Sequence, residues 1–233
     1  QGAEVAGSDR ALDQGRLGAK FEYLQARGMD LFAQDGSGLT RGAQILVASA
    51  AVEGSVPDVA KAKALGCVRM TRAQLLAELF LGAGFPELFR GFETDGATFR
   101  ALTALKPGQA VAGGTVSVDV NMLLYAYGLP MFTALVLAAR EPAWPRILLV
   151  GGVALLPFVA WGIVADVLKN IAITAGPAVA SQAGFSAGAR EVIAFAYQFG
   201  SLILPTVVPA AAWVLTHRAF LERLRVAGSG RTA

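Results

Sequence analysis

The stretch that decides the fold is Val192–Thr216, VIAFAYQFGSLILPTVVPAAAWVLT, which runs for 25 residues without a formal charge. Two similar runs precede it: Val120–Ala139 has 20 residues and Ile147–Ala165 has 19. A helix needs roughly 20 mostly apolar residues to cross a hydrocarbon core about 30 Å thick, so each run is long enough to span a bilayer. An open sheet would leave backbone groups unpaired in lipid, and a closed barrel would show alternation, so we expect helices.

The composition is also typical of a membrane protein. Charged residues make up 16% of the 233 residues, against about 25% in a typical soluble domain. The formal net charge is +3, and four arginines follow the last apolar run: Arg218, Arg223, Arg225 and Arg231. Basic residues beside a membrane helix indicate a cytoplasmic end of that helix. We therefore expect no nucleic-acid binding.

Catalytic and metal-binding signals are weak. The chain has one cysteine, Cys67, and one histidine, His217, which is too few for an intrachain disulfide or a metal cluster. The sequence contains no HExxH, GxSxG, P-loop or dinucleotide-binding motif, so we predict no cofactor, no metal and no catalytic residue. A membrane hydrolase would have to use Cys67 without a marked orienting group. No signal-peptide pattern is visible at the start.

The part of the chain before the apolar runs divides into two segments. Residues 1–72 mix charges of both signs with scattered glycines, and we predict a partly helical or disordered region with a helix from Pro57 through Ala64. Residues 73–89 predict a short apolar or interfacial helix, because Glu78 would be costly in lipid. The fold class is therefore an α-helical integral membrane protein with three transmembrane helices, or four if this segment also spans.

A small β element is predicted over residues 90–118. Asp95-Gly96 is a hairpin signal, and Thr115–Val120 alternates between polar and apolar residues. We expect a small sheet outside the lipid that leads into a three-helix transmembrane domain over residues 119–217. Residues 218–233 would form a basic tail.

The loops predict the orientation of these helices. Arg140 and Arg146 bracket the short connection between the first two runs, and the basic tail follows the third. Lys and Arg are enriched in cytoplasmic loops, so we expect this connection and the C-terminus in the cytoplasm. The β element and the Lys169–Glu191 loop would then be extracytoplasmic.

Two groups of polar residues lie in or near the predicted spans. Asp166 and Lys169 are three residues apart, so they share a helix face and can form an ion pair. This pair fits an interfacial salt bridge, and it also fits an ion or proton site. Tyr197 and Gln198 lie inside the third run, where Gln198 needs a hydrogen-bonding partner in the helix bundle or on another protein.

Four segments carry a resemblance to a known family: FETDG at Phe92–Gly96, VDVNMLLYAYGLPMF at Val118–Phe132, AWGIVADVLK at Ala160–Lys169 and AYQFGSLILPTVVP at Ala196–Pro209. From Phe92 to about Leu224 the chain resembles the exosortase H-associated membrane proteins of bacteria. The resemblance implies a non-enzymatic accessory protein of the inner membrane that binds an exosortase, its substrates or both.

The residues suggest where such a partner would bind. We expect contacts at five positions where lipid cannot satisfy a hydrogen-bonding group: Asn121, Tyr125, Tyr127, Tyr197 and Gln198. The alternative is a subunit of a small-solute or ion transporter that acts as an oligomer, with Asp166 handling the ion.

Overall fold

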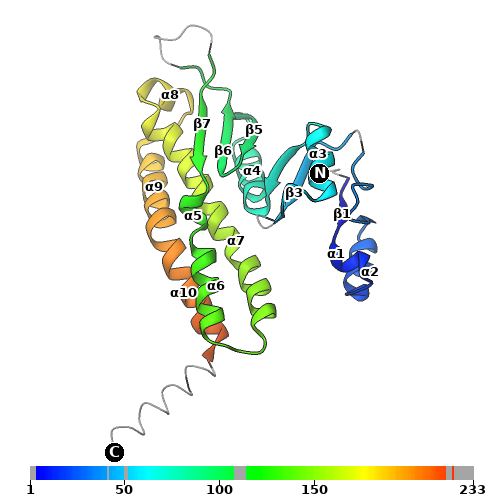
Figure 1. Ribbon diagram of the computed structural model, residues 1–233. Coiled ribbons are helices and arrows are strands. Elements are labelled where there is room, and N and C mark those ends of the chain that lie inside the picture. Colours follow the sequence, from blue (N-terminus) through cyan, green and yellow to red (C-terminus); the bar gives the residue numbers. More distant parts are fainter. Residues whose placement is uncertain (1–3, 41, 50–51, 108–113, 219–221, 223–233) are drawn as a thin grey trace, which may run out of the picture. The chain divides into compact units, whose positions relative to one another are not determined.

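The computed structural model describes residues 4–40, 42–49, 52–107, 114–218 and 222, and it divides after Arg72 into two compact units (Figure 1). We call the part up to Arg72 unit 1 and the part from Ala73 unit 2. The basic tail predicted for residues 218–233 lies outside the described residues, apart from Arg218 and Glu222.

Unit 1 begins with a parallel pair of short strands. β1 (Ala6–Ser8) pairs with β2 (Asp30–Phe32), and α1 (Arg10–Asp13) and α2 (Gly18–Gln25) lie between them in the chain. Parallel neighbours need a crossover connection, and these helices provide it. The side chain of Asp9 caps α1.

A second parallel pair follows in unit 1. β3 (Ile45–Ala48) pairs with β4 (Val68–Thr71) across α3 (Pro57–Ala64), which occupies the residues predicted for a helix. The paired strands of unit 1 were not predicted. A short apolar run such as Gln44–Val52 does not by itself distinguish a strand from a buried helix segment, and only pairing with a distant strand decides.

Unit 2 contains the predicted β element as a three-stranded antiparallel sheet. Its strands are β5 (Phe89–Asp95), β6 (Thr98–Thr103) and β7 (Ser117–Asn121), in that order across the sheet. The hairpin predicted at Asp95-Gly96 is present, and Gly96 has the positive φ of 57° that such a turn requires.

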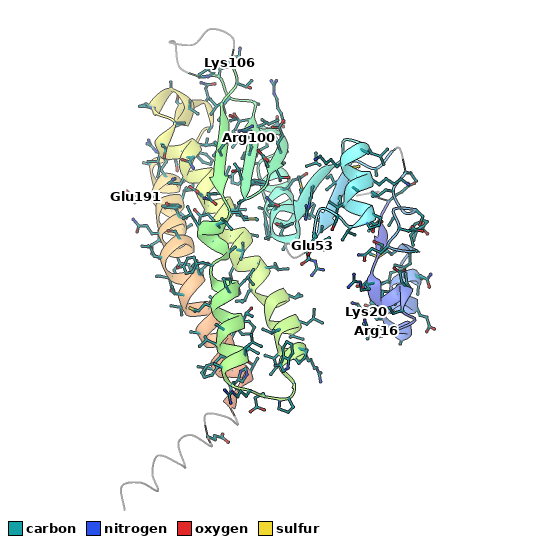
Figure 2. All side chains as sticks on the ribbon, in the orientation of Figure 1. Arg16, Lys20, Glu53, Arg100, Lys106 and Glu191 are labelled. Atoms are coloured by element: carbon teal, nitrogen blue, oxygen red, sulfur yellow. The ribbon has the colours of Figure 1, made fainter. Side chains whose placement is uncertain are left out.

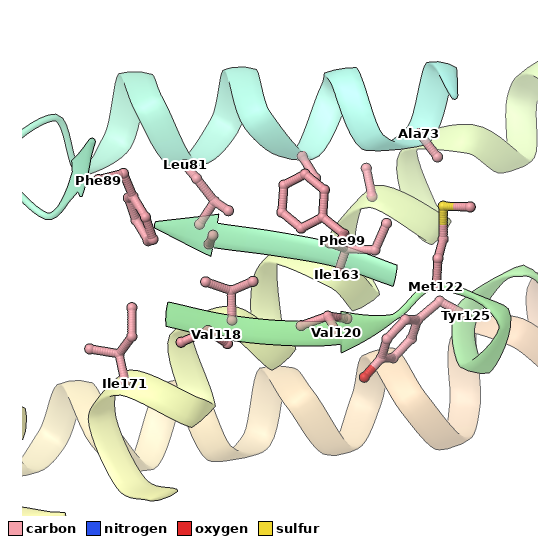
Figure 3. Close-up of a cluster of buried hydrophobic side chains, with 14 of the residues drawn as sticks. Ala73, Leu81, Phe89, Phe99, Val118, Val120, Met122, Tyr125, Ile163 and Ile171 are labelled. Atoms are coloured by element: carbon pink, nitrogen blue, oxygen red, sulfur yellow. The ribbon is translucent and has the colours of Figure 1, made fainter. Parts of the chain in front are cut away.

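One face of this sheet is part of the main hydrophobic core of unit 2. Phe99 of β6 lies opposite Val120 of β7, and both are buried, whereas Arg100 and Asp119 lie opposite each other on the exposed face. Ile163 of helix α7 (Trp144–Lys169) belongs to the same buried cluster (Figure 3). The alternation of side chains along a strand therefore separates an apolar face from a charged one.

The segment predicted as a short apolar or interfacial helix forms α4 (Arg72–Gly84). Ala73, Ala77 and Leu81, spaced four residues apart, are buried in the same core as the sheet (Figure 3). The helix has 13 residues, about 20 Å at 1.5 Å per residue, which is too short to cross a bilayer.

Among the described residues of unit 2, two helices are long and apolar enough to cross a membrane. The first has 31 residues and consists of α7 (Trp144–Lys169) and the π-helical η1 (Asn170–Thr174). The second has 30 residues and consists of α9 (Ala187–Gln198), the π-helical η2 (Phe199–Ile203) and α10 (Leu204–Thr216). The connecting segment between these helices contains α8 (Pro177–Gln182).

The first predicted span differs from the expectation. Val120 and Asn121 are the last residues of β7, and the rest of the run forms α5 (Leu123–Ala126) and α6 (Gly128–Ala138). Leu123–Ala138 is therefore a shorter apolar helical segment, so two of the three predicted spans have the length for a crossing. Val120 belongs both to the alternating pattern and to the apolar run. In the structure Val120 and Asn121 form the end of β7 rather than the start of a helix.

A second hydrophobic cluster joins α6, α7 and α10. Its buried residues are Phe132, Val136 and Leu155. The indole nitrogen of Trp213 on α10 donates a hydrogen bond of 2.9 Å to the Leu135 carbonyl of α6. These helices therefore form a small bundle beside the sheet.

Candidate functional site

A polar cluster lies at the end of α7 where this helix passes into η1. The Lys169 ammonium is 2.9 Å from a carboxylate oxygen of Asp166, and the two side chains are 22% and 10% exposed. The amide nitrogen of Asn170 donates to the same carboxylate at 3.0 Å and to the Asp166 carbonyl at 2.9 Å. The spacings of three and four residues place all three side chains on one helix face.

Two tyrosines from other helices complete this cluster. The Lys169 ammonium lies 4.4 Å from the ring centroid of Tyr197 on α9, within the range of a cation–π interaction. Tyr125 of α5 is 2% exposed, and its hydroxyl lies within electrostatic range of Asp166. This hydroxyl makes no well-formed hydrogen bond to any described residue. Figure 3 shows it pointing away from α4.

The polar cluster therefore connects four elements, α5, α7, η1 and α9. Its one carboxylate has a cationic partner and an amide partner, so the arrangement suits an internal ion pair that holds helices together. Among the described residues, no group of three His, Cys, Asp or Glu side chains could hold a metal ion. Asn170 was not singled out from the sequence, although its position four residues after Asp166 is a usable signal.

The other three predicted contact residues do not join this cluster. Tyr127, between α5 and α6, is 40% exposed, and Gln198, the last residue of α9, is also exposed. The Gln198 side chain forms no hydrogen bond within the described part of the chain. Asn121 is exposed as well, but its side-chain oxygen accepts a 3.0 Å hydrogen bond from the Leu123 N–H at the start of α5.

Gln198 directly precedes the π-helical segment η2. Short π-helical segments within α-helices occur frequently at functional sites. On the side facing α7, the indole nitrogen of Trp161 donates to the Ala196 carbonyl at 3.2 Å, and Gly200 packs against Trp161. Gln198 thus lies at an irregular point of the helix, beside residues that are already packed.

The exposed face of the sheet carries a second charged group. Arg100 donates two hydrogen bonds to Asp119, at 2.7 and 2.9 Å, and lies 3.7 Å from Glu93 (Figure 2). The hydrogen bond from Arg100 lowers the pKa of the Asp119 carboxyl, and the same bond raises the pKa of Arg100. The two charges satisfy each other, as in an ordinary surface ion pair.

Comparison with known proteins identifies the family of this chain. The profile of the exosortase H-associated membrane proteins matches residues 64–220, which is more than half of the sequence. The chain belongs to this family. The resemblance found from Phe92 onward is thereby confirmed, and the match begins earlier, so that it includes α4. Most of unit 1 of this family member lies outside the matched residues.

One curated protein is similar over part of the chain. The UDP-N-acetylmuramate–L-alanine ligase of Chloroflexus aggregans is 32% identical over 125 residues. The similarity covers 53% of this family member and 25% of the ligase, so the chain spans about a quarter of that enzyme's length. No solved structure matches the chain.

Proposed function

We propose that this family member is a non-enzymatic accessory protein of the bacterial inner membrane that binds the exosortase, its substrates or both in an exosortase-dependent protein-sorting system. Family membership supports the association with an exosortase system. The two long apolar helices support a location in the membrane, where an exosortase partner would also lie.

The observation that favours a binding role is the contrast between inward and outward polar residues. Asp166, Lys169 and Tyr197 interact with one another inside unit 2. Tyr127 and Gln198 instead present hydrogen-bonding groups on the outside of apolar helices. Lipid tails offer no partner for such groups, whereas a neighbouring membrane helix does. Tyr127 and Gln198 are therefore the proposed exosortase contacts.

The proposed arrangement in the membrane follows from the charges. Arg140 and Arg146 flank the turn between α6 and α7, and Lys and Arg favour the cytoplasmic side. The sheet, α4 and α8 would lie on the outer side and the C-terminus in the cytoplasm. In this proposal α5 and α6 complete three crossings, although they form a shorter apolar segment than the other two.

The test is co-purification of the full chain with the exosortase of the same genome, both expressed in one bacterial membrane. The Tyr127→Leu/Gln198→Leu double variant should lose the exosortase, because its hydrogen-bonding groups are gone while its apolar surface remains. The matched control is Tyr23→Leu/Gln25→Leu, which removes the same residue types from exposed positions of α2. Equal recovery of the exosortase by both double variants would count against the proposal.

A further inference from the structure

An open pocket of about 430 Å³ lies between η1, α8 and α9, and its lining includes none of the side chains of the polar cluster described above. Small residues form most of its wall, among them Ala172, Ala180, Ala187 and Ala194. Of the described residues that line it, Arg190 and Glu191 of α9 are the charged ones. Its volume falls within the range of about 300–1,000 Å³ that is usual for ligand sites.

The two charged residues of this pocket have no oppositely charged partner among the described residues of the chain. Arg190 and Glu191 are both exposed, and neither forms an ion pair within the described ranges of the chain (Figure 2 labels Glu191). A ligand that complements both residues carries a negative and a positive group. A purely anionic ligand would leave Glu191 facing a like charge.

The position of the pocket along the helices indicates the headgroup layer of a bilayer. The two long helices have 31 and 30 residues, which is about 45 Å at 1.5 Å per residue. This length exceeds a hydrocarbon core of about 30 Å and corresponds to a bilayer with its polar headgroups, about 40–45 Å. Ala172 lies near the end of the first helix and Ala187 begins the second, so the pocket is at one shared end of both.

The surface beside the charged residues is apolar. Val192 and Phe195 follow Arg190 and Glu191 on α9, and each is 68% exposed. Phe195 is four residues after Glu191, so the two side chains lie on the same helix face, one turn apart. A charged end next to an exposed apolar strip matches a molecule with a polar head and an acyl chain.

We propose that this pocket binds phosphatidylethanolamine, a zwitterionic phospholipid with a primary ammonium group. The lipid phosphate accepts hydrogen bonds from the Arg190 guanidinium, and the ammonium donates to the Glu191 carboxylate. One acyl chain lies along Val192 and Phe195. Phosphatidylcholine has a phosphate but no N–H to donate to Glu191, and phosphatidylglycerol has no positive group, so both bind more weakly.

The experiment is native mass spectrometry of the full chain in detergent, with each of the three lipids added at equal concentration. We expect phosphatidylethanolamine to bind at least about fivefold more tightly than the other two. Arg190→Gln should remove most of this binding, while Arg146→Gln, which deletes an arginine at the opposite end of α7, should leave it unchanged. Glu191→Gln should abolish the preference for ethanolamine over choline.

A second variant tests the pocket without changing its charge. Ala187→Leu fills part of the space and should weaken binding of phosphatidylethanolamine by about fivefold or more. Equal binding of the three lipids by the unmodified chain, tighter binding of phosphatidylglycerol, or equal losses for Arg190→Gln and Arg146→Gln would each overturn the proposal. The lipid-binding experiment does not measure recovery of the exosortase, so a negative result on lipid binding leaves the proposed function separately testable.

Discussion

The ring of Tyr125 on α5 occupies the space that a side chain at Gly162 of α7 would need. A Cβ atom added at Gly162 would overlap the Cγ and Cδ1 atoms of this ring, whereas one added at Gly152 of the same helix would meet no atom within 4 Å. Glycine at position 162 therefore lets α5 approach α7 and places Tyr125 beside Asp166.

Gly162→Ala should destabilise the protein by about 1–3 kcal/mol, because the added methyl group forces the buried Tyr125 ring to move. The measurement is thermal unfolding of the purified chain in detergent. Gly152→Ala serves as the control and should be neutral or slightly stabilising, since alanine is the better helix former. Equal losses for the two variants would show that the close approach of Tyr125 is not the cause.

Asp166→Asn should destabilise the protein by about 3 kcal/mol, because it leaves the largely buried Lys169 ammonium without a counter-charge. The double variant Asp166→Leu/Lys169→Leu removes both charges and should regain most of this loss. Comparison of the single and double variants by denaturant or thermal unfolding checks the expectation. A double variant as unstable as Asp166→Asn would contradict it.

Glu78→Gln should stabilise the protein by about 1 kcal/mol at pH 7. Burial raises the pKa of Glu78, and its Oε2 atom is buried without a hydrogen bond to a described residue. A raised pKa in the folded state means that stability is full below the ordinary carboxyl pKa and is lost as pH rises through the folded-state pKa.

The gain from Glu78→Gln should therefore vanish below about pH 4, where the carboxyl is protonated in both states. Thermal unfolding at a series of pH values measures it, with Glu87→Gln, an exposed position, as the control. A loss of stability at pH 7 would mean that Glu78 has a favourable partner.

Asp119→Asn should have a smaller effect with the opposite sign. The pKa of Asp119 is lowered by Arg100, so the pair adds stability above the ordinary carboxyl pKa and loses it as pH falls through the folded-state value. The pair is about half exposed, so we expect a cost below about 1 kcal/mol at pH 7. That cost should disappear in acid. Unfolding curves at pH 7 and below pH 3 measure it, and a cost of equal size at both pH values would contradict the prediction.

Local signals in the sequence predicted several elements correctly. Asp95-Gly96 gave the hairpin because the turn depends on two adjacent residues and on the positive φ that glycine allows. The runs beginning at Ile147 and Val192 became long helices because uninterrupted apolar residues of that length have few other stable forms. The first predicted span is longer than the observed helical segment, since Val120 and Asn121 belong to β7.

The polar cluster could be predicted only in parts. Asp166 and Lys169 are neighbours on one helix, so their spacing indicated a pair. Tyr125 and Tyr197 come from helices about 40 residues before and 30 residues after Asp166, and no local pattern predicts that Tyr125 lies beside Asp166 or that Tyr197 lies against Lys169. The parallel strand pairs of unit 1 escaped prediction for the same reason, because each strand is stabilised by a partner more than 20 residues away.

The amino-acid sequence by itself determined that this is a helical membrane protein with a small antiparallel sheet, because hydrophobic length, alternation and turn residues act over a few neighbouring positions. The tertiary structure alone decided how many apolar runs are long helices, which polar side chains face inward at Asp166 and which, like Gln198, face outward. Those outcomes depend on packing between helices distant in sequence, where the shape of one residue, such as Gly162, sets how closely another can approach.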